Sequence, residues 1–244
     1  MKELTKKTKV KTILDYIFLS ITFCLLLFFG IKNGQKVIKL APTLVSLVVF
    51  MLASRANRFN YLLGALNSIV YSIGFFMEGL YAGAISALVF SFGLQIITFI
   101  RWNKRSYKQA TVFRKMKWWQ EILLIVGMFS LWGILAIVLN LLPGAKLVVS
   151  DTFGFVMGNG AMFLTIFAFI EAMPFSFLNL GNSFVLWIST IIAGNTANIT
   201  YVISNSFSLY CTVWMYINWI KIYKEQQKLK KSVDKEKEIC KSEE

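Results

Sequence analysis

The chain contains no histidine, and only 12 of its 244 residues are acidic. The acids within or beside apolar segments are isolated from one another: Asp15, Glu78, Glu121, Asp151 and Glu171. No two of them have the spacing of an acid/base pair or a metal site, and no glycine-rich loop precedes a helix in a phosphate-binding context. The sequence therefore predicts no enzyme, no resident metal and no cofactor. A proton relay is also not favoured, because relays use buried carboxylates or histidines.

Cysteine and charge are scarce as well. Cys24, Cys211 and Cys240 form no spaced pair, so neither a disulfide framework nor a zinc site is indicated. Charged residues make up 16% of the chain and apolar residues 57%, whereas soluble domains carry about 25% charged residues. This composition excludes a soluble globular domain.

Eight apolar stretches fill the chain, each near the roughly 20 residues that a helix needs to cross a bilayer. The first follows a basic segment, but its apolar run is too long for an ordinary signal peptide and no A-x-A-like site follows it, which favours a retained signal anchor. The expected spans are 12–31, 37–54, 59–77, 80–100, 118–142, 151–170, 175–196 and 201–220.

Basic residues alternate between the connections of these spans. Of 26 Lys and Arg residues, 22 fall in the N-terminus, the 55–58 turn, the 101–117 loop or the tail from Lys221 to Lys241. Only Lys32, Lys36, Lys39 and Lys146 lie on the other set of connections. Short cytoplasmic loops carry the positive excess in membrane proteins, so both termini are expected in the cytoplasm. The net charge of +14 is then a signal of topology and of anionic lipid contact, and nucleic acid is not an expected partner.

A weak internal repeat relates the two halves of the chain. A shift of 117 residues places FIRWNK, residues 99–104, on YINWIK, residues 216–221. With eight spans, this shift pairs spans two to four with spans six to eight. An offset of four crossings is even, so the paired helices run in the same direction. It predicts an all-α polytopic membrane protein with two parallel three-helix repeats, a linker helix and an extra N-terminal helix, a 3+1+3 core. The expected units are 1–36, 37–104, 105–145 with the basic loop and linker, 146–222, and the charged tail 223–244.

The spans contain neutral polar and aromatic side chains. Because unpaired amides are costly in hydrocarbon, these side chains must face other helices or a wet cavity. Interhelical hydrogen bonding is one explanation. The other is a site for an uncharged or weakly cationic ring-bearing ligand, in which aromatic faces stack on the ring and amides pair with ribose or carboxamide groups. The side chains in question include Asn67, Tyr71, Gln95, Asn182, Trp187, Asn205 and Trp214.

The segment NRFNYLLGALNSIVYSIGFFMEGLY resembles the Pnu family of bacterial vitamin-precursor transporters. The resemblance rests on an N-R-x-N-Y/W-x-x-G run, a Tyr in the following helix and a G-L-Y turn. Here these are Asn57, Arg58, Asn60, Tyr61, Gly64, Tyr71, Gly79, Leu80 and Tyr81. The chain departs from that family at Gly83 and Ala87, where many members have Asp and Gln. A further family stretch in the penultimate helix is reduced to Asn182, Trp187 and Asn195.

This resemblance implies facilitated uptake of nicotinamide riboside across the plasma membrane, with cytoplasmic phosphorylation trapping the substrate. It assigns substrate binding to Trp187, Asn67, Tyr71, Gln95, Asn182, Asn205 and Trp214. Relatives associated with thiamine, riboflavin or deoxynucleosides leave the substrate open, and relatives of this kind allow a homotrimer and imply a functional link to a cytoplasmic kinase. The alternatives are a sugar facilitator of the same architecture, a substrate-binding membrane subunit of an energised importer, and a structural or assembly factor.

Overall fold

The computed structural model describes residues 2–107, 110–142 and 147–242, and Lys108 and Lys146 lie outside this part. The helices and strands are α1 (Lys2–Lys32), α2 (Val37–Ser54), α3 (Phe59–Met77), α4 (Tyr81–Ile85), the π-helix η1 (Ser86–Ser91), α5 (Phe92–Lys104), β1 (Ser106–Tyr107), β2 (Ala110–Thr111), α6 (Trp118–Leu139), α7 (Val148–Ile166), α8 (Ala172–Ile192), the 3₁₀ turn η2 (Thr196–Asn198) and α9 (Ile199–Ser242). The two strands form one short antiparallel hairpin.

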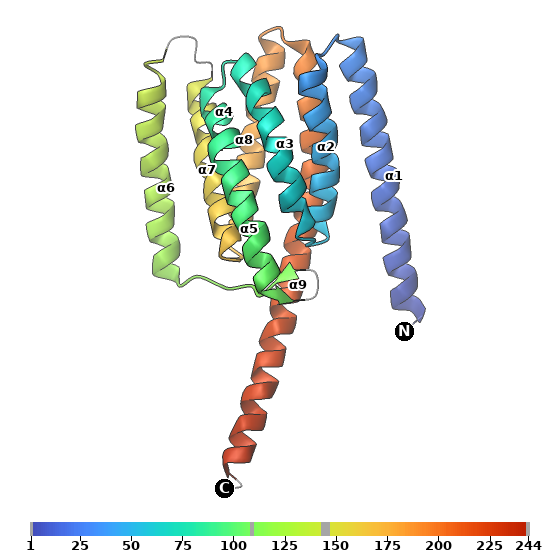
Figure 1. The fold of residues 1–244 in the computed structure, drawn as a ribbon, viewed down its shortest axis with the longest axis vertical. Coiled ribbons are helices and arrows are strands. Elements are labelled where there is room, and N and C mark those ends of the chain that lie inside the picture. The colour runs from blue at the N-terminus through green and yellow to red at the C-terminus, as the bar shows by residue number, and fades with distance from the viewer. Residues whose placement is uncertain (1, 108–109, 143–146, 243–244) are drawn as a thin grey trace.

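The long helices stand side by side and alternate in direction, so that both chain ends lie at the same end of the bundle (Figure 1). We call this end the terminal end and the other the distal end. The α2–α3 turn and the loop between α5 and α6 also lie at the terminal end (Figure 1). The all-helical prediction is therefore confirmed.

Six helical segments of the described residues are long and apolar enough to cross a membrane. They are Thr12–Lys32, Val37–Ser54, Phe59–Met77, Tyr81–Lys104, Trp118–Leu139 and Ala172–Ile192. The other two predicted spans correspond to α7 and the first part of α9, where polar side chains interrupt the apolar sequence. The count of eight crossings stays a prediction.

The fourth predicted span contains a change of helix type. α4, η1 and α5 follow one another without a break, and η1 widens the turn between Ser86 and Ser91. Short π-helical segments within α-helices are rare and frequently occur at functional sites. Here the wider turn keeps two serines that are five residues apart on the same side of the helix.

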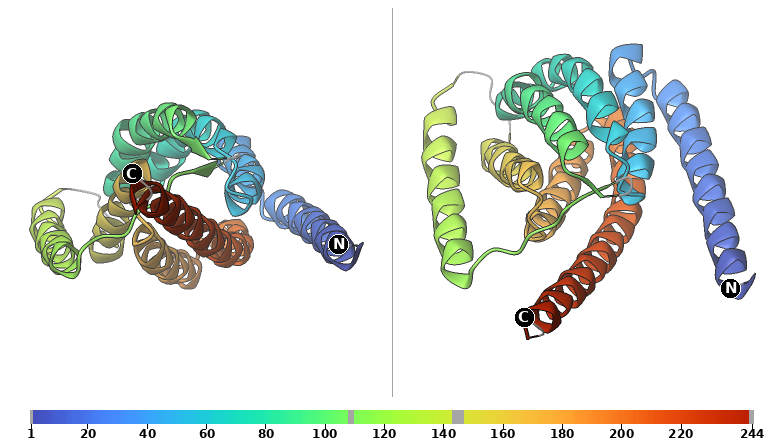
Figure 2. Two further views of the ribbon diagram at one scale, coloured as in Figure 1. Left: turned by 90° about the horizontal axis from the view of Figure 1, so that it is seen from below. Right: turned by 60° about the horizontal axis from the view of Figure 1, so that its bottom comes forward.

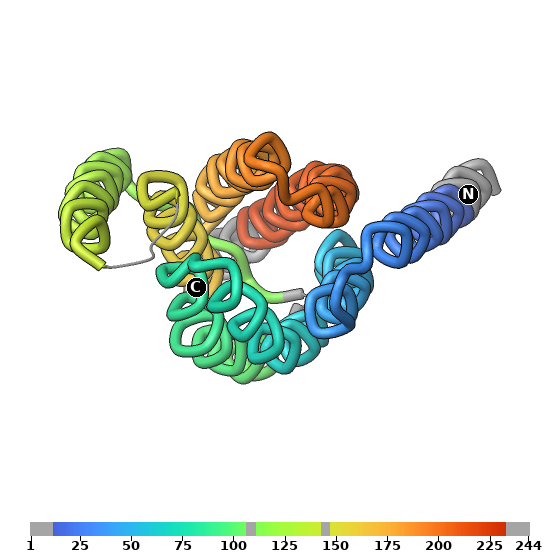
Figure 3. The backbone as a smooth tube through the Cα atoms, turned by 90° about the horizontal axis from the view of Figure 1, so that it is seen from above, coloured from blue at the N-terminus to red at the C-terminus, as the bar shows by residue number. Residues whose placement is uncertain are grey.

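Two groups of helices face each other. α2, α3 and the α4–η1–α5 segment form one group, and α7, α8 and α9 form the other, with contacts between α2 and α9 and between α5 and α7. The end-on views show the two groups enclosing a common centre (Figures 2 and 3). α1 packs outside against α2 and α9, while α6 packs outside against α7.

Aromatic side chains close the centre at the terminal end. Trp102 of α5 and Trp219 of α9 lie with ring centroids 5.6 Å apart. Phe113, from the loop before α6, packs against both, at 5.9 Å from Trp102 and 4.6 Å from Trp219. All three are at most 3% exposed.

The loop that carries Phe113 is fastened at several points. The Phe113 amide donates to Gln226 Oε1 at 2.9 Å, and the Arg114 amide donates to the Ala168 carbonyl at 2.8 Å. The Met116 amide donates to Glu171 Oε1 at 3.1 Å. The loop therefore joins the α7–α8 turn to the extension of α9.

At the distal end, an ion pair within the first group is hydrogen-bonded to the second group. Lys39 of α2 donates to Glu78, which follows α3. Asn195, in the α8–η2 turn, donates to the second oxygen of Glu78 at 3.1 Å. Charged and amide side chains thus tie the groups together where the bundle ends.

Candidate functional site

A cavity of about 480 Å³ lies between the two groups of helices. Its walls come from α2, α3, α4, η1, α5, α7, α8 and α9, and none of its lining residues belongs to α1 or α6. The volume falls within the roughly 300–1,000 Å³ of small-molecule sites. Both outer helices are therefore accessory to the cavity.

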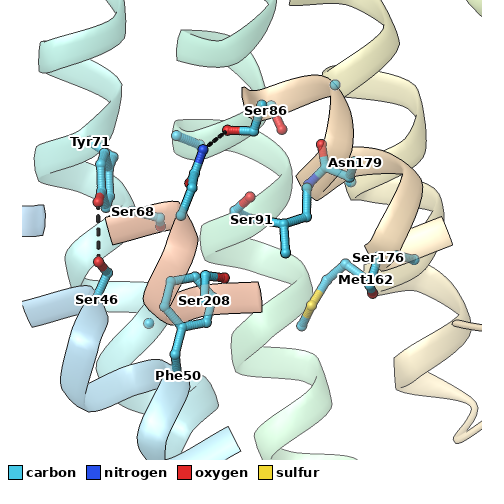
Figure 4. Close-up of a pocket in the computed structure, with 18 of the residues that line it drawn as sticks. Ser46, Phe50, Ser68, Tyr71, Ser86, Ser91, Met162, Ser176, Asn179 and Ser208 are labelled. Atoms are coloured by element: carbon cyan, nitrogen blue, oxygen red, sulfur yellow. Dashed lines mark hydrogen bonds between the residues drawn. The ribbon is translucent and has the colours of Figure 1, made fainter. Parts of the chain in front are cut away.

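Hydroxyl groups line much of the cavity, as Figure 4 shows for Ser46, Ser68, Ser86, Ser91 and Ser208. Carboxamides accompany them on both groups of helices. Asp151 is the one lining residue with a formal charge, and no Lys or Arg is among the lining residues of the described chain. Such a wall suits a polar ligand without a large negative charge.

Six of the seven predicted site residues line the cavity. They are Asn67, Tyr71, Gln95, Asn182, Trp187 and Asn205. Trp214 does not line it, and its ring lies against Tyr210 with centroids 6.4 Å apart. The lining positions of α9 recur every three or four residues, as in Tyr201, Asn205 and Ser208. Position 214 falls off that line because a helix turns by about 100° per residue.

The carboxamides also form hydrogen bonds within the protein, which is the first of the two explanations that the sequence analysis gives for them. Asn67 Nδ2 donates to the Pro42 carbonyl at 2.9 Å. Asn182 accepts from the Ser150 hydroxyl at 2.8 Å and donates to the Ser150 carbonyl at 2.7 Å. Each amide is fixed in place and keeps hydrogen-bonding capacity, since a carboxamide offers two donors and two acceptor lone pairs.

A hydrogen-bonded group joins three helices on one side of the cavity. Tyr71 of α3 donates to the Ser46 hydroxyl of α2 at 3.3 Å (Figure 4). The Ser46 oxygen lies 3.4 Å from the Ser204 oxygen of α9. On the opposite wall, Asn159 of α7 donates to Ser86 of η1 at 2.8 Å. Both sets link the two groups of helices across the cavity.

Gly64 gives Gln95 its place on the wall. A Cβ atom at Gly64 would overlap the amide oxygen of Gln95, so α3 and α5 approach closely at this point. Gly158 has a similar effect on α7, where a Cβ would lie 3.2 Å from Nδ2 of Asn179. Glycine thus leaves room for amide side chains that face the cavity.

A row of aromatic rings lies along the cavity. Tyr71 stacks on Phe75 with centroids 5.7 Å apart, and Phe75 stacks on Trp187 at 6.1 Å. Trp187 stacks on Tyr201 at 4.0 Å, a separation that leaves no room for a ligand ring between these two. Both are 4% exposed. The row is a rigid aromatic wall built from α3, α8 and α9.

The sequence analysis did not single out Asn179, Tyr201 or Phe75 for this site. Asn179 precedes Asn182 by three residues and Tyr201 precedes Asn205 by four, so helical spacing would have placed both on the predicted faces. All three line the cavity. Asp151 was noted only as an isolated acid, because its partners lie 68 and 69 residues away in the chain.

Residues 36–221 match the sequence profile of the nicotinamide mononucleotide transporter family. The chain belongs to this family. The match leaves out α1 and the charged extension of α9, and neither contributes a lining residue to the cavity. The nicotinamide mononucleotide transporter family consists of transporters, so the chain is a membrane transporter rather than an enzyme. The resemblance to the Pnu family is thereby confirmed.

The fold is similar to the crystal structure of the vitamin B3 transporter PnuC, with a TM-score of 0.74. Sequence identity is 16% over 87% of this chain and 92% of that one. Comparison with curated proteins gives no match. At this identity the structural match supports the fold, and the substrate has to be argued from the cavity.

Proposed function

We propose that the protein is a facilitative transporter of nicotinamide riboside, or of a closely similar nucleoside-like vitamin, in the plasma membrane. The cavity between the two groups of helices is the observation that carries this proposal. It offers carboxamides and hydroxyls for a ribose and a carboxamide, and a row of aromatic rings beside them for a heterocycle. We assign substrate contact to Asn67, Tyr71, Gln95, Asn182, Trp187 and Asn205.

The lining favours a nucleoside over a nucleotide. A phosphate group carries close to two negative charges and is normally bound by Arg, Lys or a helix N-terminus. The described lining has no Lys or Arg, and Asp151 adds a negative charge. The phosphate of a mononucleotide would lose its hydration in the cavity without gaining a cationic partner, at a cost of several kcal/mol.

The same reasoning supports trapping by a cytoplasmic kinase. Phosphorylation inside the cell would convert a substrate that fits the cavity into one that the cavity repels. The product could then not return through the transporter. Net uptake would need neither a coupling ion nor an ATP site on this chain.

For the topology, we propose eight crossings with both termini in the cytoplasm and two parallel three-helix units, 37–104 and 146–222, joined by α6. Matching turns support the repeat. α2 and α7 are each followed by an alanine with positive φ, Ala56 at 53° and Ala168 at 59°. α3 and α8 are each followed by a glycine with positive φ, Gly79 at 75° and Gly194 at 99°.

The test is a thermal-shift screen of the purified protein. Nicotinamide riboside should raise the melting temperature, whereas nicotinamide mononucleotide, thiamine, riboflavin and hexoses should give smaller shifts or none. Stabilisation scales with ligand concentration over Kd, so a titration also ranks the compounds. Stabilisation by hexoses alone would favour the sugar facilitator, and a larger shift with the mononucleotide would contradict the proposal.

A further inference from the structure

We infer that Asp151 selects a positively charged ring, so that the transporter prefers a pyridinium or similar cationic heterocycle to its neutral counterpart. This inference rests on the proposed function and names a determinant of specificity within that site. It concerns a charge that the predicted set of binding residues does not include.

Asp151 lies in the first turn of α7 and is 7% exposed. Its Oδ2 accepts the Ala82 amide and its Oδ1 accepts the Gly83 amide, each at 3.0 Å. Both donors belong to the first turn of α4, in the opposite group of helices. These backbone donors hold the carboxylate in place.

Among the residues that the structure describes, none is a cationic partner of this carboxylate. The ion pairs among the described residues are Lys39 with Glu78 and Arg55 with Asp15. A carboxylate offers about four lone-pair sites, and the two amides occupy two of them. Within the described part of the chain, Asp151 is therefore a fixed carboxylate on the wall of the cavity that forms no ion pair.

Gly83 brings this charge next to the aromatic row. A Cβ at Gly83 would lie 3.2 Å from Asp151 Oδ1 and 3.4 Å from the nearest ring carbon of Phe75. Phe75 stacks on both Tyr71 and Trp187. The carboxylate and the row of rings thus meet at one point of the wall.

Both features attract the same kind of ligand. The face of an aromatic ring attracts a cation through its quadrupole, and a carboxylate attracts a cation directly. A neutral ring of the same shape gains stacking from the row but nothing from the charge. Nicotinamide riboside has a cationic pyridinium ring, and its reduced dihydro form keeps the ribose and the carboxamide without the charge. Comparison of this pair in the wild type and in Asp151 variants isolates the contribution of Asp151.

A purely structural role would give a different result. As a cap on the start of α4, Asp151 would influence all ligands through the shape of the cavity. Asn and Ser also accept hydrogen bonds from the first amides of a helix. Asp151→Asn and Asp151→Ser each keep one acceptor oxygen for these amides while removing the charge. Glu121→Gln, in the first turn of α6 and away from the cavity, removes the same charge elsewhere.

The experiment is isothermal titration of the purified full chain with nicotinamide riboside and its dihydro form. The wild type should bind the charged form at least about tenfold more tightly, a difference of 1.4 kcal/mol. Either Asp151 variant should reduce this ratio severalfold, mainly by weakening the charged form, while the aromatic row retains a smaller preference, and Glu121→Gln should leave the ratio unchanged. Circular dichroism and melting temperature establish that each variant is folded.

Equal affinity of the wild type for the two forms would overturn the inference whatever the variants do. An equal loss of both affinities in a folded Asp151 variant would also overturn it, in favour of the capping role. If neither form binds the wild type, the proposed function itself fails and the inference fails with it. Binding without discrimination is thus distinguishable from the absence of binding.

Discussion

Trp187 shows how single side chains prepare the cavity. Its indole is 4% exposed and packs against Tyr201 at 4.0 Å and Phe75 at 6.1 Å. A side chain that is already immobile loses little conformational entropy when a ligand binds. Trp187 is therefore an anchor whose position is set before the substrate arrives.

Trp187→Ala should abolish uptake of nicotinamide riboside while the protein remains folded and inserted. Loss of the ring removes one aromatic wall and leaves its stacking partners free to move. Uptake into proteoliposomes and the amount of inserted protein are the measurements. Trp132→Ala, on α6, is the matched control and should transport normally. Normal uptake by Trp187→Ala would remove Trp187 from the site.

Gly64→Ala should lower stability by about 1–3 kcal/mol, the usual cost of overpacking. The added methyl group would overlap the Gln95 amide. Removing that amide in Gly64→Ala/Gln95→Ala should restore most of the loss. Gly93→Ala, on α5 with nothing near its added carbon, should be neutral or slightly stabilising. Additive effects of the two changes in thermal denaturation would show that Gly64 and Gln95 do not interact.

At the residue scale, the sequence predicts many of the side chains that face the cavity. It predicts less well which other residues those side chains contact. Neutral amides in apolar spans had to face a polar interior, and Asn67, Asn182 and Asn205 do so. Trp214 does not line the cavity, because the lining face of α9 follows a helical line that passes beside it. The contact of Asp151 with α4 depends on how α7 packs, which spacing in the chain does not encode.

At the scale of elements, the loop before α6 is part of the closure rather than a simple connection. Its basic residues predicted a cytoplasmic connection. The structure shows in addition that Phe113 packs against Trp102 and Trp219 beneath the cavity. The π-helix η1 is a second feature that the sequence does not reveal, because an apolar run has the same composition in either helix type.

Phe113→Ala should open the terminal end of the cavity. Its ring packs against the indoles of two helices from different groups. The measurement is the labelling rate of Ser176→Cys, a cavity position, by a membrane-impermeant maleimide in a background without the native cysteines. The rate should rise severalfold, whereas the exposed neighbour Val112→Ala should leave it unchanged. An unchanged rate in Phe113→Ala would place the closure elsewhere.

At the scale of the whole molecule, two groups of helices enclose the cavity, and α1 and α6 flank these groups (Figure 3). α1 also carries Asp15, which accepts the Tyr210 hydroxyl at 2.6 Å. The all-helical architecture follows from the apolar runs, whereas the count of eight crossings stays a prediction. That the two groups of helices enclose a single cavity cannot be predicted from the sequence, because it depends on how the helices pack in three dimensions.

Reporters fused to the two ends test the topology. Because 22 of 26 basic residues fall on the terminal-end segments, fluorescent proteins that mature only in the cytoplasm should be bright at both ends. A periplasmic phosphatase at the same positions should be inactive. Removal of residues 1–32 should move the new N-terminus to the outside. Phosphatase activity at either end of the full chain would contradict the even number of crossings.

The central claim is that the cavity passes an unphosphorylated nicotinamide nucleoside. Counterflow in proteoliposomes tests it most directly. Labelled nicotinamide riboside outside should accumulate transiently when the vesicles contain unlabelled riboside, and should not accumulate when they contain the mononucleotide. Accumulation that is as fast with the mononucleotide inside, or no accumulation with the riboside, would contradict the account.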